Sequence, residues 1–342
     1  MIPSIKLLNL DLELIGLIDD YQSFYFEEKY SDIGECTLTI SAFSENFKLI
    51  TKNMILYLSE FQCFYIEEIN IENDIAEIKA LTLNFILGHR ITIPPKGATH
   101  ISYKNNLTGE IIKAFVKDCL ITSSDKTRNI NLKLKETDVG HLVDYQSRYK
   151  NLFDETKALA DYSAIGFRLG INIKDKHFVF ETYNGRDMTQ EIIFSELYDN
   201  IDNISITDSN LSYKNFIFVA GQGEGVDRKI ISVSDTSKSG WTRREDIKDS
   251  RDKEEEENLE LEGEKLLAEY CEKTSIEATI FSEEDVRLGD IVTIITKKYG
   301  YQFSQRVLQI DTEYTKTTGK TVNVIIGNQK PTFTFKEDDI FE

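Results

Sequence analysis

The sequence predicts a mainly β fold of the α+β class, with β-rich ends, a mixed α/β middle and a further helix in the C-terminal half. Three observations support this prediction. Apolar and polar residues alternate with a period of two near both ends, which is typical of half-buried strands. Helical spacing of apolar residues occurs in the middle and in one acidic segment. The strands are short and separated by turns, which favours small antiparallel barrels or sandwiches over a doubly wound sheet.

The alternation is clearest where Cys36, Leu38 and Ile40 are interleaved with polar residues. The same pattern recurs at residues 76–80, 276–280 and 322–326. Successive side chains of a strand point to opposite faces, so each of these segments has one apolar face for a core. The two ends of the chain are therefore predicted to be β domains, covering residues 1–95 and 191–342.

The middle, residues 96–190, is predicted to be an α/β domain, with the turn Pro94-Pro95-Lys96-Gly97 as its boundary. One helical face of its first helix carries Leu107, Ile111, Ile112, Phe115, Val116 and Cys119. A second helix is predicted for roughly residues 150–165, ending at Gly166, because glycine readily adopts a helix C-cap conformation. The strand-like segments FRLGINI and HFVFET follow it.

A third helix is predicted inside the C-terminal domain, at about residues 253–274. Its inner side carries Leu259, Leu266, Leu267, Tyr270 and Cys271. Its first turn, Glu254 to Glu257, is acidic and complements the positive end of the helix dipole.

The composition excludes several functional classes. With 59 acidic and 40 basic residues the formal charge is -19, which repels phosphate backbones and argues against stable nucleic-acid binding. No stretch approaches the ~20 apolar residues that a membrane helix needs, so no membrane segment is predicted. The first residues lack a signal-peptide pattern, and we expect the chain to fold in the cytoplasm.

Catalytic and metal-binding patterns are also missing from the sequence. The cysteines, at positions 36, 63, 119 and 271, form no C-x-x-C pair, and the four histidines form no H-E-x-x-H motif. The glycine-rich stretch GQGEG at residues 221–225 leads into the strand-like VDRKIISVS, which indicates a hairpin turn instead of a phosphate-binding loop. We expect no catalytic residues, no cofactor and no metal.

The most distinctive segment is GWTRREDIKDSRD at residues 240–252, which contains the only tryptophan. Trp and Arg are the residues most enriched at the energetic centres of interfaces. Composition alone leaves two interpretations open, an interface and a solvated strand with many salt bridges. The interface candidates of this segment and of the helix after it are Trp241, Arg243, Arg244, Glu245, Asp249, Arg251, Asp252 and Tyr270.

At this segment the sequence resembles the siphovirus and prophage tail proteins that are related to the baseplate hub of contractile tails and tail-like bacteriocins. The family pattern is an aromatic Trp, an Arg-Arg-Glu cluster, an acidic residue with Ala/Ser-Arg-Asp, and a Glu-rich helix ending in Leu-x-Glu-Tyr. Here it reads Trp241, Arg243-Arg244-Glu245, Asp249-Ser250-Arg251-Asp252 and Leu267-Ala268-Glu269-Tyr270. The resemblance continues through LGDIV at residue 288 and the closing segments VLQIDTEY and KTVNVIIG.

The resemblance implies two small tube-protein-like β-barrels separated by the α/β domain, in a non-enzymatic hub protomer. Three copies would form a homotrimeric, pseudo-sixfold ring between the tail tube and the spike or tip. The implied partners are the tail tube or distal tail protein, the spike or tip protein and the tape-measure protein. The implied location is the tail tip of a virion or tail-like particle, after synthesis in the bacterial host cytoplasm.

Two alternatives remain for the function. One is the hub-like region of a tail-associated cell-wall hydrolase, although the sequence ends soon after the last predicted strand, so we expect no hydrolase domain. The other is a host-glycan-binding tail module, for which clustered exposed aromatic residues are expected. The 16 Tyr and 20 Phe are instead spread through strand-like segments, where packing in cores accounts for most of them.

Overall fold

The computed structural model describes residues 3–234, 237–251, 256–280, 286–298 and 300–327. This part of the chain is mainly β, as predicted. It forms one large sheet of 13 strands, two sheets of three strands and one of two strands, with three α-helices beside them. Short 3-10 helices lie at Phe47–Leu49, Leu83–His89, Lys126–Arg128, Glu196–Tyr198, Gly225–Asp227 and Gly240–Thr242.

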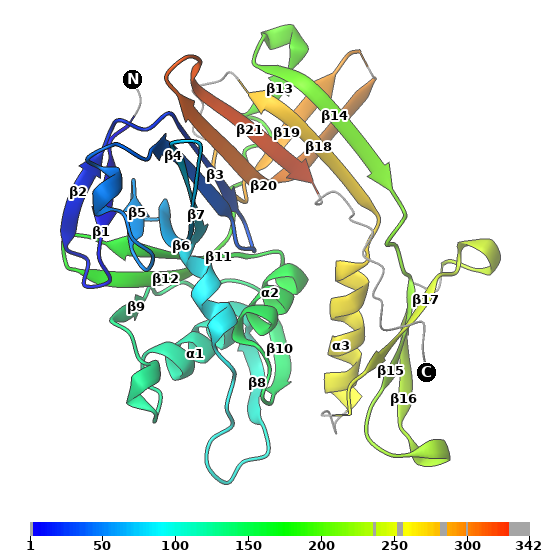
Figure 1. The fold of residues 1–342 in the computed structure, drawn as a ribbon. Coiled ribbons are helices and arrows are strands. Elements are labelled where there is room, and N and C mark those ends of the chain that lie inside the picture. The colour runs from blue at the N-terminus through cyan, green and yellow to red at the C-terminus, as the bar shows by residue number, and fades with distance from the viewer. Residues whose placement is uncertain (1–2, 235–236, 252–255, 281–285, 299, 328–342) are drawn as a thin grey trace.

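The N-terminal strands belong to the large sheet (Figure 1). They are β1 (Ile5–Leu8), β2 (Leu14–Ile18), β3 (Ser23–Lys29), β4 (Glu35–Ser41), β5 (Ile55–Tyr57), β6 (Cys63–Glu72) and β7 (Ile75–Thr82). Burial alternates along β4 as predicted, with Cys36, Leu38 and Ile40 buried. These side chains pack with Phe26 and Phe64 in one hydrophobic core.

The middle contains the two predicted helices and their strands. The elements are β8 (Ile101–Leu107), α1 (Thr108–Leu120), β9 (Leu132–Leu134), β10 (Leu142–Ser147), α2 (Leu152–Ser163), β11 (Gly166–Asn172) and β12 (His177–Tyr183). The predicted apolar face of α1 is buried from Ile111 to Cys119. Leu83 and Leu87 pack into the same core, so this core extends into the N-terminal segment.

The predicted end of α2 at Gly166 is wrong. The helix ends at Ser163, and Ala164 adopts the left-handed conformation with φ of 52°. Gly166 instead begins β11, where a Cβ atom would lie 2.4 Å from a ring carbon of Tyr30. The glycine is needed for this close approach between elements, which a local cap pattern cannot distinguish from a helix end.

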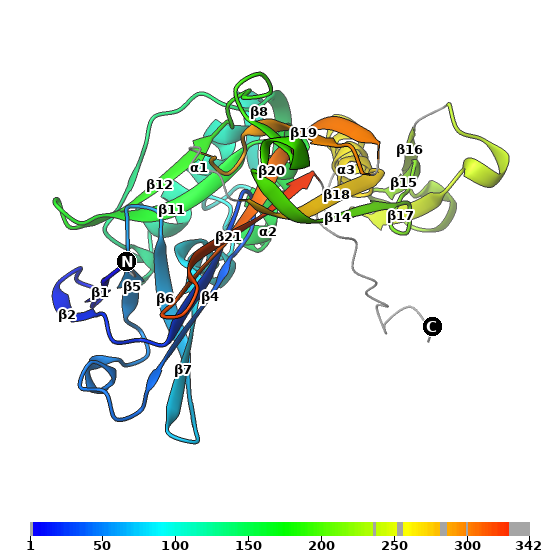
Figure 2. The same ribbon diagram turned by 90° about the horizontal axis from the view of Figure 1, so that it is seen from above.

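The C-terminal strands join the N-terminal strands in one sheet. They are β13 (Ile193–Ser195), β14 (Ile201–Ser209), β18 (Lys273–Ile280), β19 (Ile291–Thr296), β20 (Tyr301–Thr315) and β21 (Gly319–Gly327). β20 pairs antiparallel with β3, from Gln309 opposite Lys29 to Thr315 opposite Ser23. The two β-rich ends of the chain therefore lie side by side (Figures 1 and 2). The separate closure of two barrels and the domain limits at residues 95 and 190 stay predictions.

A second α/β unit projects beside the middle, at the right of Figure 1. It consists of β15 (Phe216–Ala220), β16 (Ile230–Ser234), β17 (Glu245–Asp249) and α3 (Glu256–Glu269). The predicted extension of the third helix to residue 274 is wrong, because Lys273 opposite Ser209 already begins the pairing of β18 with β14. Residues 253–255 of the predicted helix lie outside the described residues.

Candidate interaction surface

The distinctive segment forms the edge of a three-stranded sheet that α3 covers on one face. β15 is the central strand, antiparallel to β16 and parallel to β17. Ile217 and Val219 on β15 are fully buried against Leu259 of α3. Gly263 allows the helix to approach closely, because a Cβ atom there would lie 2.5 Å from a methyl carbon of Val233. One face of this small sheet is thus a closed core.

The opposite face of the sheet is partly open to solvent and mixes apolar side chains with polar ones, among them Ser232, Glu245 and Asp249. Phe216 and Phe218 point away from α3, since they alternate with the buried Ile217 and Val219. Their rings lie 5.0 Å apart. Ile247, opposite Phe218, is 63% exposed, and Ile230, opposite Ala220, is 54% exposed. We name this set of Phe216, Phe218, Ile230 and Ile247 the outer face.

Trp241 lies in the segment that leads into β17 and is fully exposed. It lies in the short 3-10 helix Gly240–Thr242, whose capping box joins Ser239 and Thr242. The Thr242 hydroxyl donates to the Ser239 carbonyl at 2.9 Å. Covering an indole ring removes roughly 150–250 Å² from water, a gross gain of about 4–6 kcal/mol. An exposed Trp held by a structured turn is therefore a strong candidate for a contact residue.

The two adjacent arginines hold neighbouring parts of the same unit. The Arg243 guanidinium lies 3.5 Å from the centre of the Phe216 ring and forms an ion pair with Glu245 at 2.5 Å. Arg244 donates from its backbone to the Asn215 side chain at 2.8 Å, and its guanidinium donates to the Asn210 carbonyl. These contacts fix the chain between β14 and β15 to the start of β17.

The far end of β17 is tied to the glycine-rich loop. Asp249 accepts a hydrogen bond from Arg228 at 2.7 Å and pairs with Arg251 at 3.3 Å. Arg228 also donates to the carbonyls of Ala220 and Gly221, both at 3.1 Å. The loop at residues 221–225 thus lies in the connection between the antiparallel strands β15 and β16, which confirms the hairpin interpretation.

Tyr270 lies on the other side of the sheet, directly after α3, and packs partly buried against the core that contains Leu259. Its carbonyl accepts a hydrogen bond from the Lys214 backbone at 3.0 Å. Burial raises the pKa of the Tyr270 hydroxyl, and the nearby carboxylates of Glu269 and Asp246 raise it further. The hydroxyl therefore stays protonated at neutral pH.

The structure brings most of the predicted interface residues to one small unit. Trp241, Arg243, Arg244, Glu245, Asp249 and Arg251 lie on or beside β17, and Tyr270 lies behind the sheet. Asp252 lies outside the described residues. The ion pairs that the structure shows here connect this segment with itself and with the hairpin loop, not with α3.

Sequence reasoning missed Phe216, Phe218, Ile230 and Ile247. A signal was present, because NFIFVA is apolar at successive positions and therefore gives a strand two apolar faces. Only one of those faces can meet α3. The other was not recognised as surface, since a strand buried on both faces has the same pattern.

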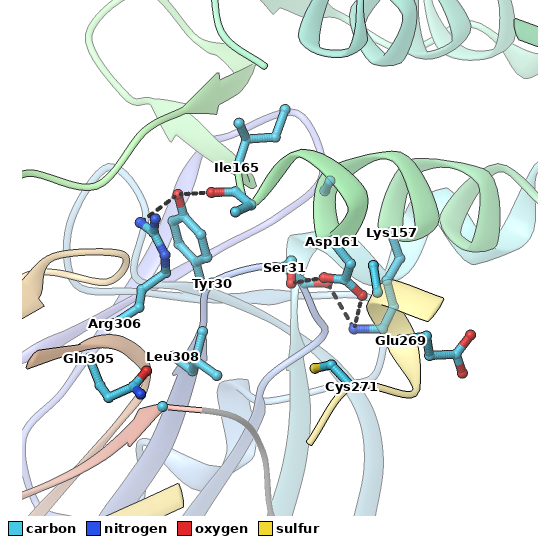
Figure 3. A pocket seen from close by; sticks show the side chains of 14 residues that line it. Tyr30, Ser31, Lys157, Asp161, Ile165, Glu269, Cys271, Gln305, Arg306 and Leu308 are labelled. Carbon is cyan, nitrogen blue, oxygen red and sulfur yellow. Dashed lines mark hydrogen bonds and ion pairs between the residues drawn. The ribbon is translucent and has the colours of Figure 1, made fainter. Parts of the chain in front are cut away.

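A pocket of about 450 Å³ lies where α2, the end of α3 and β20 meet (Figure 3). Three of its polar side chains, Ser31, Lys157 and Asp161, are bound to one another. Ser31 donates to Asp161 at 2.6 Å, and Lys157 pairs with Asp32 at 3.0 Å and Asp161 at 3.4 Å. Burial lowers the pKa of Lys157, but these two carboxylates outweigh it, so the pKa lies above its ordinary value. Lys157 is thus a charged structural residue and a poor nucleophile.

At the other end of the pocket, Arg306 donates to the Gly289 carbonyl at 2.6 Å and its guanidinium lies over the Tyr30 ring. The Tyr30 hydroxyl lies 3.3 Å from the carbonyl oxygens of both Ala164 and Tyr183, which share its single proton. These contacts link the N-terminal, middle and C-terminal parts of the chain. The described residues hold no group of three or more His, Cys, Asp or Glu side chains suited to a metal ion. Within them, no helix is long and apolar enough to span a bilayer.

The fold is that of prophage tail proteins. Prophage tail protein gp18 of Listeria monocytogenes EGD-e aligns with a TM-score of 0.59 and 14% identity, covering 96% of each chain. The 43 kDa tail protein of prophage MuSo2 from Shewanella oneidensis aligns with a TM-score of 0.60 and 12% identity, covering 95% of this chain and 98% of that one. The tail protein of Neisseria meningitidis MC58 gives 0.58 at 11% identity, with coverages of 95% and 96%.

The family can be stated as well as the fold. The profile of the Siphovirus ReqiPepy6 Gp37-like proteins matches residues 4–328. The chain belongs to this siphovirus tail-protein family. A comparison with curated proteins found no match.

Proposed function

We propose that this protein is the baseplate hub or tail-tip protein of a phage or phage tail-like particle. Three copies form a pseudo-sixfold ring that joins the tail tube to the spike or tip. The observation that carries this proposal is the pairing of β3 with β20. This pairing holds the two β-rich ends side by side in each protomer. A ring of three protomers would therefore contain six β-rich ends around one axis.

The outer face and Trp241 are proposed to contact the neighbouring protomer of that ring. Exposed apolar patches on a folded protein mark interaction sites. The Arg243 and Asp249 ion pairs hold β17 in place, so the surface is preorganised and loses little conformational entropy on association. In this arrangement Arg243 and Asp249 contribute mainly by holding β17 in position, and Trp241 and the outer face make the contact.

The remaining partners belong to the two ends of the ring. The tail tube or distal tail protein would bind the pseudo-sixfold side, and the spike or tip protein the threefold side, with the tape-measure protein in the lumen. The charge of -19 favours a lumen that lets DNA pass without binding it. The location follows as the tail tip of a virion or tail-like particle, after synthesis in the bacterial host cytoplasm.

Cryo-electron microscopy of the intact particle tests the ring. Three copies of this chain at the tube tip are expected. Six copies in one ring would indicate a tube or distal-tail ring protein, and a dimer would exclude the proposed symmetry.

The protein is also proposed to be non-enzymatic, which the ion pairs and hydrogen bonds that join Ser31, Lys157 and Asp161 in the pocket support. We expect purified protein to leave peptidoglycan and generic esterase, peptidase and phosphatase substrates intact. Turnover that persists through repurification and disappears in an Asp161→Asn variant would show an active site instead, with the Asp19→Asn variant, on the exposed N-terminal surface, as the control.

A further inference from the structure

The strand β2 forms one edge of the large sheet. It pairs with β1, and within the described residues no strand pairs with its other side. Figures 1 and 2 place β2 at the rim of the molecule, far from the unit that contains Trp241. Its outward-facing backbone N–H and C=O groups are therefore available to another chain.

The edge is apolar as well as open. Leu14, Ile15 and Leu17 are 57%, 38% and 50% exposed, and the five residues of the strand include no charge and no proline. Soluble proteins usually protect such edges with charges, prolines or bulges, because an open apolar edge pairs readily with other strands. β2 has no charge and no proline within its length, although its register with β1 shifts between Leu14 and Gly16.

The opposite edge of the same sheet is protected. β14 carries Asp202 and Asp208, and its register with β18 shifts between Asp202 and Ser205. Asn203 within this irregularity has a positive φ of 52°. Both edge strands have an irregular register, but only β14 carries charges within the strand, so the uncharged apolar edge is a property of β2 and not of the sheet as a whole.

The charges that flank β2 limit what can bind there. Asp11 and Glu13 precede the strand, and Asp19 and Asp20 follow it. In an antiparallel pair of two β2 strands centred on Gly16, each Glu13 would lie opposite an Asp19, and like charges in that position are destabilising. Pairing with β14 of another copy would bring Asp202 and Asp208 to these carboxylates. A second copy is therefore a poor occupant.

We propose that β2 accepts a strand from a different tail protein, one that is apolar in its centre and carries Lys or Arg at both ends. Backbone hydrogen bonds to the open edge supply affinity, as in other cases of strand addition. The acidic flanks select the partner and set its register through charge complementarity. This inference does not depend on the proposed ring, so its failure would leave the ring proposal intact.

Hydrogen exchange of the full chain tests the proposal with a synthetic probe. The probe is a short peptide of alternating Val and Thr with two Lys at each end, and its matched control has two Glu at each end. With the Lys-flanked peptide, the amides of residues 14–18 should exchange roughly tenfold more slowly. The Glu-flanked peptide should give no protection, and the protection by the Lys-flanked peptide should fall as salt rises.

The variant Leu17→Lys should abolish protection, because it puts a cation on the apolar edge next to the cationic peptide. Leu17 is half exposed, so the variant should keep the melting temperature. Leu197→Lys is the matched control, since Leu197 is 64% exposed but lies beside β14, and it should leave protection unchanged. Equal protection by both peptides, protection by neither, or protection of residues 14–18 by raised protein concentration alone would each overturn the proposal.

Discussion

Arg243 and Arg251 flank the same strand, yet their surroundings differ. Arg243 stacks on Phe216 and is 39% exposed, whereas Arg251 is 67% exposed and pairs with Asp249 at 3.3 Å. The Arg243→Lys variant should lower the free energy of unfolding by about 1 kcal/mol, because a lysine loses the planar stacking contact. The Arg251→Lys variant should stay within about 0.5 kcal/mol of the parent, as exposed ion pairs contribute little.

Urea denaturation of both variants, followed by circular dichroism, measures the difference. Equal effects of the two substitutions would mean that the stacking on Phe216 adds nothing to the stability of this unit.

Trp241 tests the surface without touching the core. Because its side chain is fully exposed, Trp241→Ala should leave the melting temperature unchanged. It should weaken ring assembly by about 2 kcal/mol or more, the loss expected for a central contact residue. Mass photometry measures the fractions of monomer and trimer, and so the loss in the free energy of assembly. Phe43→Ala is the control, since Phe43 is 73% exposed on a distant loop. If both variants weakened ring assembly equally, Trp241 would not be a specific contact residue of the ring.

At the scale of elements, the packing of α3 on its sheet depends on Gly263. The Gly263→Ala variant should lower the free energy of unfolding by roughly 1–3 kcal/mol, because the added methyl group would overlap Val233. Adding Val233→Ala should recover part of this loss by removing the overlapping methyl carbon. Gly88→Ala is the matched control, since a Cβ atom there meets nothing within 4 Å. Thermal unfolding of the four proteins gives the comparison.

A destabilised Gly88→Ala with an unchanged Gly263→Ala would show that α3 can shift freely on the sheet. The close approach of helix and sheet would then not be what holds the outer face in position.

At the scale of the whole molecule, charge opposes association. Each chain carries -19, and three chains in a ring repel one another over the Debye length, about 10 Å at 0.1 M salt. We expect light scattering to show more trimer as ionic strength rises, or a monomer that becomes a trimer when the cognate spike is added. A trimer that dissociates on adding salt would mean that attractive ion pairs, and not apolar contacts such as that of Trp241, hold the ring together.

Most strands and helices, and the apolar face of each, could be predicted from the sequence. Cys36, Leu38 and Ile40 alternate strictly, and Ile111 to Cys119 follow a helical period, so local spacing was sufficient. The sequence also located the segment around Trp241, because Trp and Arg are chemically distinctive. The ends of α2 and α3 were predicted less well. Gly166 belongs to β11 and Lys273 to β18, so neither residue ends a helix.

Which faces and edges stay open could not be predicted, because it depends on contacts between distant segments. Phe216 and Ile217 are both apolar, but α3 covers Ile217 and leaves Phe216 on the opposite face. Likewise, the sequence does not show that β1 pairs on both of its sides whereas β2 pairs with β1 alone in the described residues. The joining of the two β-rich ends through β3 and β20 was equally invisible. Local periodicity predicts that a face is apolar, but it does not predict which segment covers that face. The covering segment can lie hundreds of residues away in the sequence, as β3 and β20 do.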